Sequence, residues 1–451
     1  MFKRLILYIE LVATVILYYC APQVYSLTYC HTCFILFLLA FIILYKERCN
    51  QNLIRFEFIF SITFFFTNYV YPIFYYPINP YFSLFHLDFP EEYISSACAL
   101  TTIGYVAFCI GVLKYRAPEI FVNLNSLTNR FKVPLAYIPI TIALTLLLMV
   151  SLFDILKSGI YDGNWGEGSI YKVLADIFIC YIIFAKFTSG IPLKNLILNN
   201  KIFFFIVICY ILEITTIGNR GLILRISILT LFLYTIFYHR INKGVVISLF
   251  IGGLMLLYYV GTVRGGGEFE GFGNLDNKEI PVIIQVGKDL TINNRSLYVL
   301  MKYYQEFGPT YGRTWLMNIL SVIPFSQSAY LSISGASLGD INSASLVTDL
   351  HFSGATDDDI IGLGTNLIGD IYVCFGLLGV IIFMYILGRG LSFTYAKGAK
   401  GNLVYLFIYA IMFMDCIILT RSTYLTSIRP ITWGLVLYIL SKISVNHSSN
   451  F

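Results

Sequence analysis

The apolar residues of this 451-residue chain are gathered into long, nearly uninterrupted blocks. In all, 58% of the residues are apolar and 12% are charged, whereas about 25% are charged in a typical soluble domain. A membrane β-barrel would show short strands of alternating polarity instead of solid blocks. The pattern therefore predicts an all-α polytopic membrane protein.

We expect about twelve transmembrane helices, because a span needs about 17–25 mostly apolar residues and the shorter blocks can include flanking residues. The first block follows "MFKR" and lacks a small-residue cleavage site, so we expect a retained helix rather than a removed signal peptide. The chain then divides into 1–262 with the first nine helices, 263–365 as one large loop or cap, and 366–451 with the last three helices. The expected spans are 5–21, 27–45, 56–76, 93–113, 133–156, 173–187, 202–217, 222–238, 245–260, 367–387, 403–420 and 431–443.

The charges in the connections predict an orientation. "KERCNQNLIR", "HRINKG" and "GRGLSFTYAKGAKGN" are rich in Lys and Arg, whereas "HLDFPEE" and "YDGNWGEG" are acidic. Because cytoplasmic loops carry an excess of Lys and Arg, we expect both termini in the cytoplasm. The large loop, 263–365, is then expected outside.

Seven arginines fall on the outer side, where this rule leaves few of them. Guanidinium groups bind phosphate and carboxylate oxygens in a bidentate manner, which an ammonium group cannot do. We therefore expect an anionic ligand at the outer membrane surface, while the alternative, pairing with Glu213, Asp370 or Asp415, stays open for some of them. The arginines are Arg220, Arg225, Arg264, Arg295, Arg313, Arg421 and Arg429.

Three further residues are candidates for acid–base chemistry. Asp370 opens the tenth expected helix. Glu213 lies seven residues before Arg220, so Glu213 and Arg220 share a helix face if the helix continues that far. His351 is the histidine of the large loop. A structural role remains the alternative for each of them.

Two sequences have spacings that metal sites also use. The acidic run Asp357–Asp359 contains a D-x-D, and "CHTC" places Cys30 and Cys33 around a histidine. Acids in a polar loop are usually solvated, and a cysteine pair within an apolar block usually packs as small apolar residues. We expect no metal at either place.

The large loop is predicted to contain helices at the membrane surface. "VIIQVGKDLTINNRSLYVLMKYYQEF" has apolar residues at helical spacing with charges between them, which indicates an amphipathic helix. "GPTYGRTWLMNILSVIPF" is too short to span a bilayer and reads as an interfacial or re-entrant segment. This mixture predicts a folded cap.

Five ordered motifs resemble the bacterial O-antigen polymerases, the Wzy family. The resemblance covers roughly residues 200 to 435, and the first half of the chain matches only as a run of spanning helices. The motifs are "GNRGLILRISILTLFLY", "VGTVRGG", "PTYGRTWLMNILSVIPFSQSAYL", "GLGTNLIGDIYVCFGLLGVIIFMYILG" and "RSTYLTSIRP".

The resemblance implies an inner-membrane glycosyltransferase of GT-C-like architecture, active at the periplasmic face. Its donor and acceptor would be oligosaccharide repeat units on undecaprenyl diphosphate, within membrane lipid, and a chain-length regulator is a possible protein partner. Arg220 and Arg264 match the family's arginine motifs, Asp370 matches an acid that opens a late helix, and Arg421 and Arg429 match less closely. Neither a metal, a cofactor nor nucleic acid is implied.

The chemistry agrees with the residue types. A diphosphate leaving group gains charge that fixed guanidinium groups stabilise, and the acceptor hydroxyl needs a base. Asp370 is the first candidate for the base, followed by Glu213 and His351. Two alternatives stay open: an O-antigen ligase, which would use Arg295 and His351 in one large loop, and a transporter or flippase of a lipid-linked or anionic sugar.

Overall fold

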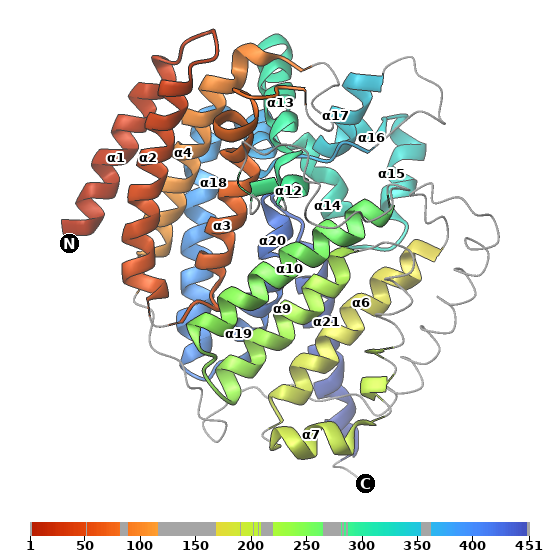
Figure 1. Ribbon diagram of the computed structural model, residues 1–451. Coiled ribbons are helices and arrows are strands. Elements are labelled where there is room, and N and C mark those ends of the chain that lie inside the picture. Colours follow the sequence, from red (N-terminus) through yellow and green to blue (C-terminus); the bar gives the residue numbers. More distant parts are fainter. Residues whose placement is uncertain are drawn as a thin grey trace. The chain divides into compact units, whose positions relative to one another are not determined.

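The computed structural model describes residues 2–50, 52–81, 89–115, 168–189, 191–201, 203–205, 207–208, 220–264, 281, 284–285, 287–352 and 362–448. Across these ranges the regular secondary structure is helical, with no strand (Figure 1). The predicted all-α class is confirmed for this part of the chain. The expected span at 133–156, most of the one at 202–217, Glu213 and the acidic run Asp357–Asp359 lie outside the described residues.

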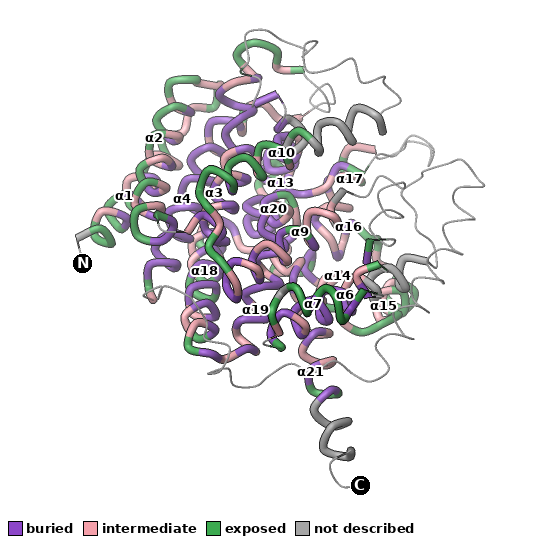
Figure 2. Tube along the Cα trace, turned by 60° about the horizontal axis from the view of Figure 1, so that its bottom comes forward, coloured by how far each residue is buried: buried purple, intermediate pink, exposed green. Residues whose placement is uncertain are grey.

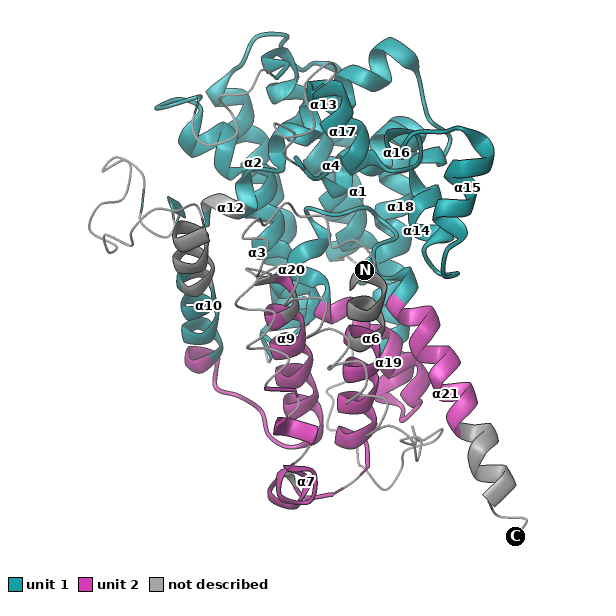
Figure 3. Cartoon of the chain, turned by 90° about the vertical axis from the view of Figure 1, so that its right-hand side faces the viewer, with its two compact units in different colours: residues 1–117, 246–396, 415–429 teal, residues 118–245, 397–414, 430–451 magenta. Residues whose placement is uncertain are grey.

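The chain forms two compact units, which are coloured separately in Figure 3. Unit 1 comprises Met1–Ala117, Val246–Ala396 and Asp415–Arg429. Unit 2 comprises Pro118–Val245, Lys397–Met414 and Pro430–Phe451. Each unit is therefore assembled from segments that are far apart in the sequence.

Unit 1 contains a layer of long apolar helices in which α4 is central. Both α1 and α2 pack along α4 (Figure 1), and α4 is buried over nearly its whole length (Figure 2). The helices of this layer are α1 (Phe2–Tyr19), α2 (Leu27–Leu44) with the π-helical turn η1 (Tyr45–Cys49), α3 (Phe56–Asn68) with η2 (Tyr71–Tyr75), α4 (Ile94–Val112) preceded by η4 (Glu91–Tyr93), and α18 (Leu367–Ala399), which leaves unit 1 after Ala396. The short helix α20 (Cys416–Leu419) is also in unit 1. Unit 1 also holds most of α10 (Lys243–Arg264).

The large loop folds into a set of short helices in unit 1, beyond the part that is not described. The segment predicted as one amphipathic helix forms two, α12 and α13. The second is amphipathic: Leu297, Tyr298 and Met301 are buried, whereas Lys302 and Glu306 are exposed. The elements are α12 (Lys288–Thr291), α13 (Asn294–Phe307), η6 (Arg313–Trp315), α14 (Leu316–Leu320), α15 (Ser326–Ser334), α16 (Leu338–Ile341) and α17 (Ser343–Phe352). We refer to residues 288–352 as the cap helices.

Unit 2 is held together by aromatic packing between helices. Phe232 of α9 lies with its ring centroid 5.3 Å from that of Tyr409 and 4.8 Å from that of Phe413, both of α19. Phe184 of α6 packs on Phe407 of the same helix at 5.1 Å. The helices are α6 (Gly168–Phe187), α7 (Leu193–Asn199), α9 (Arg220–Phe237), α19 (Leu403–Met414) and α21 (Ile428–Ser448), which enters unit 2 at Pro430.

Within the described residues, three helices are long and apolar enough to cross a membrane: Leu27–Cys49, Glu91–Val112 and Leu367–Ala399. Two of the other expected spans are interrupted. The expected span 56–76 consists of α3 followed by η2, and 403–420 consists of α19 and α20, separated at Asp415. The count of about twelve spans is therefore not confirmed.

The helix α18 extends beyond the predicted end of its span. "GRGLSFTYAKGA" was expected as part of a basic loop, but it continues the helix to Ala399. Leu391, Ser392 and Tyr395 within this stretch are buried, so one face of the extension packs against the protein while its basic residues lie elsewhere on the helix. Burial of that face explains the additional turns.

The same helix is broken near its start. Gly376 has φ 64° and ψ −160°, which is not helical. The carbonyl groups of Val373 and Cys374 instead accept hydrogen bonds from the backbone N–H groups of Thr310 and Tyr311, at 2.9 and 3.1 Å. The turn after α13 therefore satisfies backbone groups that the break in α18 leaves open.

Candidate functional site

A buried arginine and a histidine meet between two of the cap helices. Arg295 is the second residue of α13 and only 2% exposed. His351 lies near the end of α17, and its Nδ1 is 2.9 Å from Nη2 of Arg295. A guanidinium group can only donate, so His351 Nδ1 is the acceptor and the proton of the neutral ring lies on Nε2. The pair therefore links the start of α13 to the end of α17 through a buried guanidinium group.

This pair lines a pocket of about 560 Å³ in unit 1. That volume is within the range of pockets that hold small-molecule ligands. The lining comes from the segment before α4, from α13 and from the end of α17. Its residues are Phe89, Pro90, Glu92, Arg295, Val299, Lys302, Tyr303, Glu306, Phe307, Leu350 and His351.

The lining combines aromatic rings with charges of both signs. The rings of Tyr303 and Phe307 are neighbours with centroids 4.8 Å apart. One turn apart on α13, Lys302 Nζ and Glu306 Oε1 are separated by 3.9 Å, and both side chains are 50% exposed. Glu92 is exposed and adds a second carboxylate. The pocket can thus hold an apolar ring face, donate to an anion and accept a proton.

Asp370 occupies a different and closed environment in unit 1. Its side chain is 0% exposed. Oδ2 accepts hydrogen bonds from Trp315 Nε1 and from the backbone N–H of Tyr424, each at 2.8 Å, and Oδ1 accepts one from the Ser343 hydroxyl at 2.6 Å. The carboxylate therefore joins η6, the start of α17 and the turn after α20. This burial favours a positioning role over contact with a substrate.

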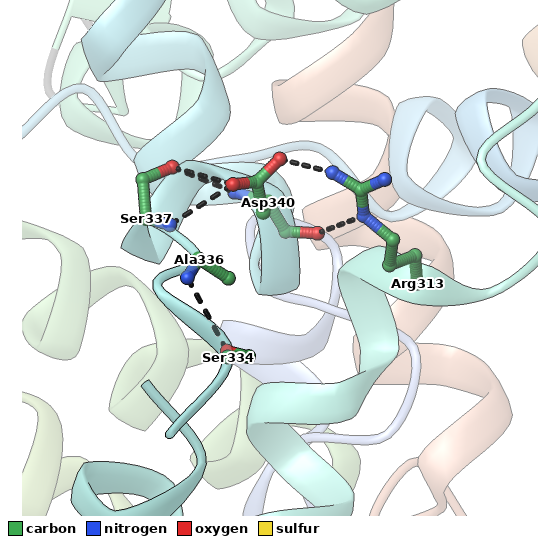
Figure 4. A network of polar contacts seen from close by, with 5 residues as sticks. All are labelled: Arg313, Ser334, Ala336, Ser337 and Asp340. Atoms are coloured by element: carbon green, nitrogen blue, oxygen red, sulfur yellow. Dashed lines mark hydrogen bonds and ion pairs between the residues drawn. The ribbon is translucent and has the colours of Figure 1, made fainter. Parts of the chain in front are cut away.

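Arg313 is paired with an acid of the cap (Figure 4). Its Nη2 donates to Asp340 Oδ1, and its Nε donates to the Asp340 carbonyl oxygen at 3.4 Å. Asp340 also forms a capping box with Ser337 at the start of α16. The backbone N–H of Ser337, and then its hydroxyl and the charge of Arg313, lower the pKa of the Asp340 carboxyl.

This lowered pKa predicts how one substitution depends on pH. A carboxyl whose folded-state pKa is depressed stabilises the fold above its unfolded pKa, and the contribution is lost as the pH falls through the folded value. We expect Asp340→Asn to lower the free energy of unfolding at neutral pH by about 0.2–1 kcal/mol, the size measured for exposed ion pairs. The difference from the unaltered protein should narrow only below the ordinary aspartate value of 3.8.

Thermal unfolding in detergent over a series of pH values measures this difference. Ser334→Ala is the control, because it removes an uncharged hydrogen bond to the N–H of Ala336 nearby, and its effect should not change with pH. A difference for Asp340→Asn that stays constant into strong acid would contradict the assignment.

The other expected arginines lie on elements different from those that line the pocket. Arg220 opens α9 in unit 2 and Arg264 closes α10 in unit 1, and their side chains are not among those described. Arg421 is exposed after α20, and Arg429 is half-buried in the first turn of α21. Of the expected residues, the pocket brings together Arg295 and His351.

Sequence reasoning overlooked the pocket's carboxylates. Glu92 belongs to "HLDFPEE", which served only to predict the orientation. Lys302 and Glu306 are spaced i, i+4 in the predicted amphipathic helix, and this was the available signal. Their proximity to Arg295 follows from one helix, whereas that of Glu92 depends on tertiary packing.

Among the residues that the structure describes, no three His, Cys, Asp or Glu side chains are grouped as metal ligands would be. In "CHTC", Cys30 and Cys33 are buried on one face of α2, whereas His31 is exposed. This arrangement favours the packing interpretation of the two cysteines.

Comparison with known proteins gives one match. The family model described as O-antigen polysaccharide polymerase Wzy matches residues 2–447, nearly the whole chain. Neither a curated protein nor a solved structure matches the chain.

Proposed function

The chain belongs to the O-antigen polysaccharide polymerase Wzy family, and from this membership we propose that it is an inner-membrane glycosyltransferase of GT-C-like architecture. Its reaction joins oligosaccharide repeat units carried on undecaprenyl diphosphate, at the periplasmic face. The observation that supports a specific site is the pocket that the hydrogen-bonded Arg295 and His351 line together with two carboxylates. We place the reaction in this pocket.

In this proposal the Arg295–His351 pair binds the leaving diphosphate. Transfer of a glycosyl group moves negative charge onto the departing phosphate oxygen, and fixed donors stabilise that charge without having to reorganise. Arg295 is 2% exposed, and electrostatic stabilisation is stronger where water is excluded. His351 contributes through Nε2–H, so in this state it acts as a donor and not as a base.

A carboxylate of the same pocket accepts the proton of the acceptor hydroxyl. Glu92 and Glu306 are exposed and line the pocket, which allows contact with a substrate. A positioned base contributes about 10²–10⁴-fold to a rate. Phe89, Tyr303 and Phe307 supply apolar faces against which sugar rings can pack.

The remaining arginines are proposed contacts to the lipid-linked diphosphates. Arg220 and Arg264 match the family's arginine motifs, and Arg421 and Arg429 match its last outer turn less closely. Arg313 keeps this assignment although it pairs with Asp340. Because guanidinium groups carry the neutralising charge, we propose that no metal ion is required. A chain-length regulator is the proposed protein partner.

The products of a strain that lacks the protein test the reaction. A polymerase deficiency should leave lipid A core that carries a single repeat unit. Bare core together with lipid-linked polymer would instead indicate an O-antigen ligase, and repeat units retained on the cytoplasmic side would indicate a transporter. Purified protein should extend lipid-linked units in the presence of a chelator, whereas a strict requirement for a divalent ion would contradict the metal-free mechanism.

Labelling tests the proposed face. Tyr311 in the cap is 80% exposed, and Cys20 is the exposed cysteine among the described ones. In a Cys20→Ser background, Tyr311→Cys should react with a membrane-impermeant maleimide added to the periplasm of intact cells. Reaction only after the inner membrane is opened would place the cap in the cytoplasm.

A further inference from the structure

We infer that the first turn of α18 positions the Arg295–His351 pair, with Asp370 as its positioning residue. The inference rests on the proposed function, because it assigns the pair to the reaction. Two adjacent residues of this turn make separate connections: Asp370 to α17, which carries His351, and Gly369 to α13, which carries Arg295.

The connection to α17 is a hydrogen bond at the first residue of that helix. The Ser343 hydroxyl donates to Asp370 Oδ1 at 2.6 Å and lies 3.0 Å from the Thr365 hydroxyl. His351 is in the same ten-residue helix, Ser343–Phe352. The two residues are eight positions apart on one continuous helix, which is about 12 Å at a rise of about 1.5 Å per residue, so we expect a shift at Ser343 to be carried to His351.

The connection to α13 is a close approach of two helices. A Cβ on Gly369 would lie 3.0 Å from Leu300 Cδ1 and 3.3 Å from Leu297 Cα. The absence of a side chain therefore lets α13 lie directly against the first turn of α18. Ser296, which follows Arg295, also donates its hydroxyl to the Gly364 carbonyl at 3.2 Å.

Asparagine side chains fix this turn to the rest of unit 1. Asn366 caps α18, because its Oδ1 accepts hydrogen bonds from the backbone N–H groups of Ile368 and Gly369 at 2.9 and 3.3 Å. Its Nδ2 donates to Asn68 Oδ1 at 2.9 Å. Asn294, next to Arg295, donates to the Asn68 carbonyl at 3.3 Å. Asn366 at the start of α18 and Asn294 beside Arg295 are thus both hydrogen-bonded to Asn68 of α3.

Asp370 suits this role because of how its oxygens are used. Three donors from three segments point at a side chain that is 0% exposed. Hydrogen bonds to an ionised group are roughly twice as strong as neutral ones. These three bonds, which we call the Asp370 node, therefore fix η6, α17 and the turn after α20 relative to one another. The carboxylate thus acts through His351 and does not contact the substrate.

Activity measurements on variants of the node test the inference. Asp370→Asn should lower kcat about tenfold or more, since displacing a catalytic group by about 1 Å can cost up to about 10²-fold, and KM should change little. Ser343→Ala removes only the connection to α17 and should reproduce a large part of that loss. Ser61→Ala is the matched control, because it removes a buried hydroxyl contact of 2.6 Å to Tyr105 away from the cap; its kcat should stay within about twofold.

A distance measurement separates this inference from the proposed function. Spin labels at Lys302→Cys on α13 and Leu350→Cys on α17, in the Cys20→Ser background, report the separation of the two helices without any activity assay. Asp370→Asn and Ser343→Ala should broaden the distance distribution, and Ser61→Ala should leave it sharp. If Arg295 variants prove fully active, the proposed function fails while this measurement still tests the node.

The outcome that would overturn the inference is specific. If Asp370→Asn abolishes turnover with an unchanged distance distribution, and Ser343→Ala remains fully active, then Asp370 acts directly as the base. The pH profile of kcat gives the same distinction: a positioning residue leaves its acidic limb in place, whereas loss of the base removes that limb.

Discussion

Replacing Arg295 with alanine is expected to lower polymer formation by about 10²–10³-fold, the range measured when one fixed donor is removed from an oxyanion site. The side chain is buried and donates to His351. Its loss removes a positive charge from a site with little access to water, so water cannot stabilise the leaving group in its place. Arg295→Lys should recover only part of the activity, because a lysine keeps the charge but not the planar fork. Ladders of polymer on gels and rates with purified protein measure the effect.

His351 should behave as the partner of this arginine. We expect His351→Ala to reduce the rate strongly and His351→Gln to retain more of it, since glutamine can still accept from Arg295 and donate to the ligand. The double variant, Arg295→Ala with His351→Ala, should lower the rate little more than Arg295→Ala alone does, because the two side chains act as one unit.

Lys302→Ala is the matched control for the Arg295 and His351 variants. Lys302 lines the same pocket and carries the same charge as Arg295, but its side chain is 50% exposed. Its removal should change the rate only severalfold. Equal losses for Lys302→Ala and Arg295→Ala would show that total positive charge matters and the buried pair does not. Normal ladders from the Arg295 variants would remove this pocket from the reaction.

Gly376→Ala is the second substitution with a large expected effect, here on folding. The backbone at φ 64° and ψ −160° belongs to a region that is essentially restricted to glycine, and a side chain there costs about 1–3 kcal/mol. A Cβ would also lie 2.5 Å from Tyr304 Oη and 3.0 Å from its Cζ. Because cellular abundance falls severalfold for about 1–2 kcal/mol, the variant should accumulate poorly in membranes and unfold at a lower temperature.

Two further variants make the Gly376 prediction specific. Gly390→Ala lies on the same helix with nothing within 4 Å of its added Cβ, so it should be neutral or slightly stabilising. Tyr304→Phe in the Gly376→Ala background removes the nearest clashing atom and should restore part of the lost stability. A Gly376→Ala protein with an unchanged unfolding temperature would mean that α18 can straighten at this point.

The class of the fold was predictable because a bilayer leaves the backbone few choices. A solid apolar block in lipid must satisfy its own N–H and C=O groups, and a helix does so within the segment. The expected spans beginning at Leu27 and Tyr93 match helices that are long enough to cross. Helix ends were less predictable, as in α18, where burial of Leu391 and Tyr395 extends the helix through a stretch that resembles a loop.

Composition did not rank the candidate site residues. All seven arginines were expected on the same side of the membrane, and neither their residue type nor their spacing in the sequence favoured Arg295. Its importance comes from burial beside His351, a residue 56 positions away in the chain. Asp370 was expected to open a helix, but its enclosure by Trp315, Ser343 and Tyr424 depends on tertiary packing.

The sequence by itself determined that this is an all-α membrane protein and pointed to the family that the match over residues 2–447 established, because apolar blocks and ordered motifs are local properties of the chain. Only the tertiary structure decided which polar residues meet. Arg295, His351 and Glu92 come from three separate segments, and Asp370 accepts hydrogen bonds from η6, from α17 and from the turn after α20. These contacts depend on how helices that are far apart in the sequence pack together. The periodicity of residues along the chain does not predict them.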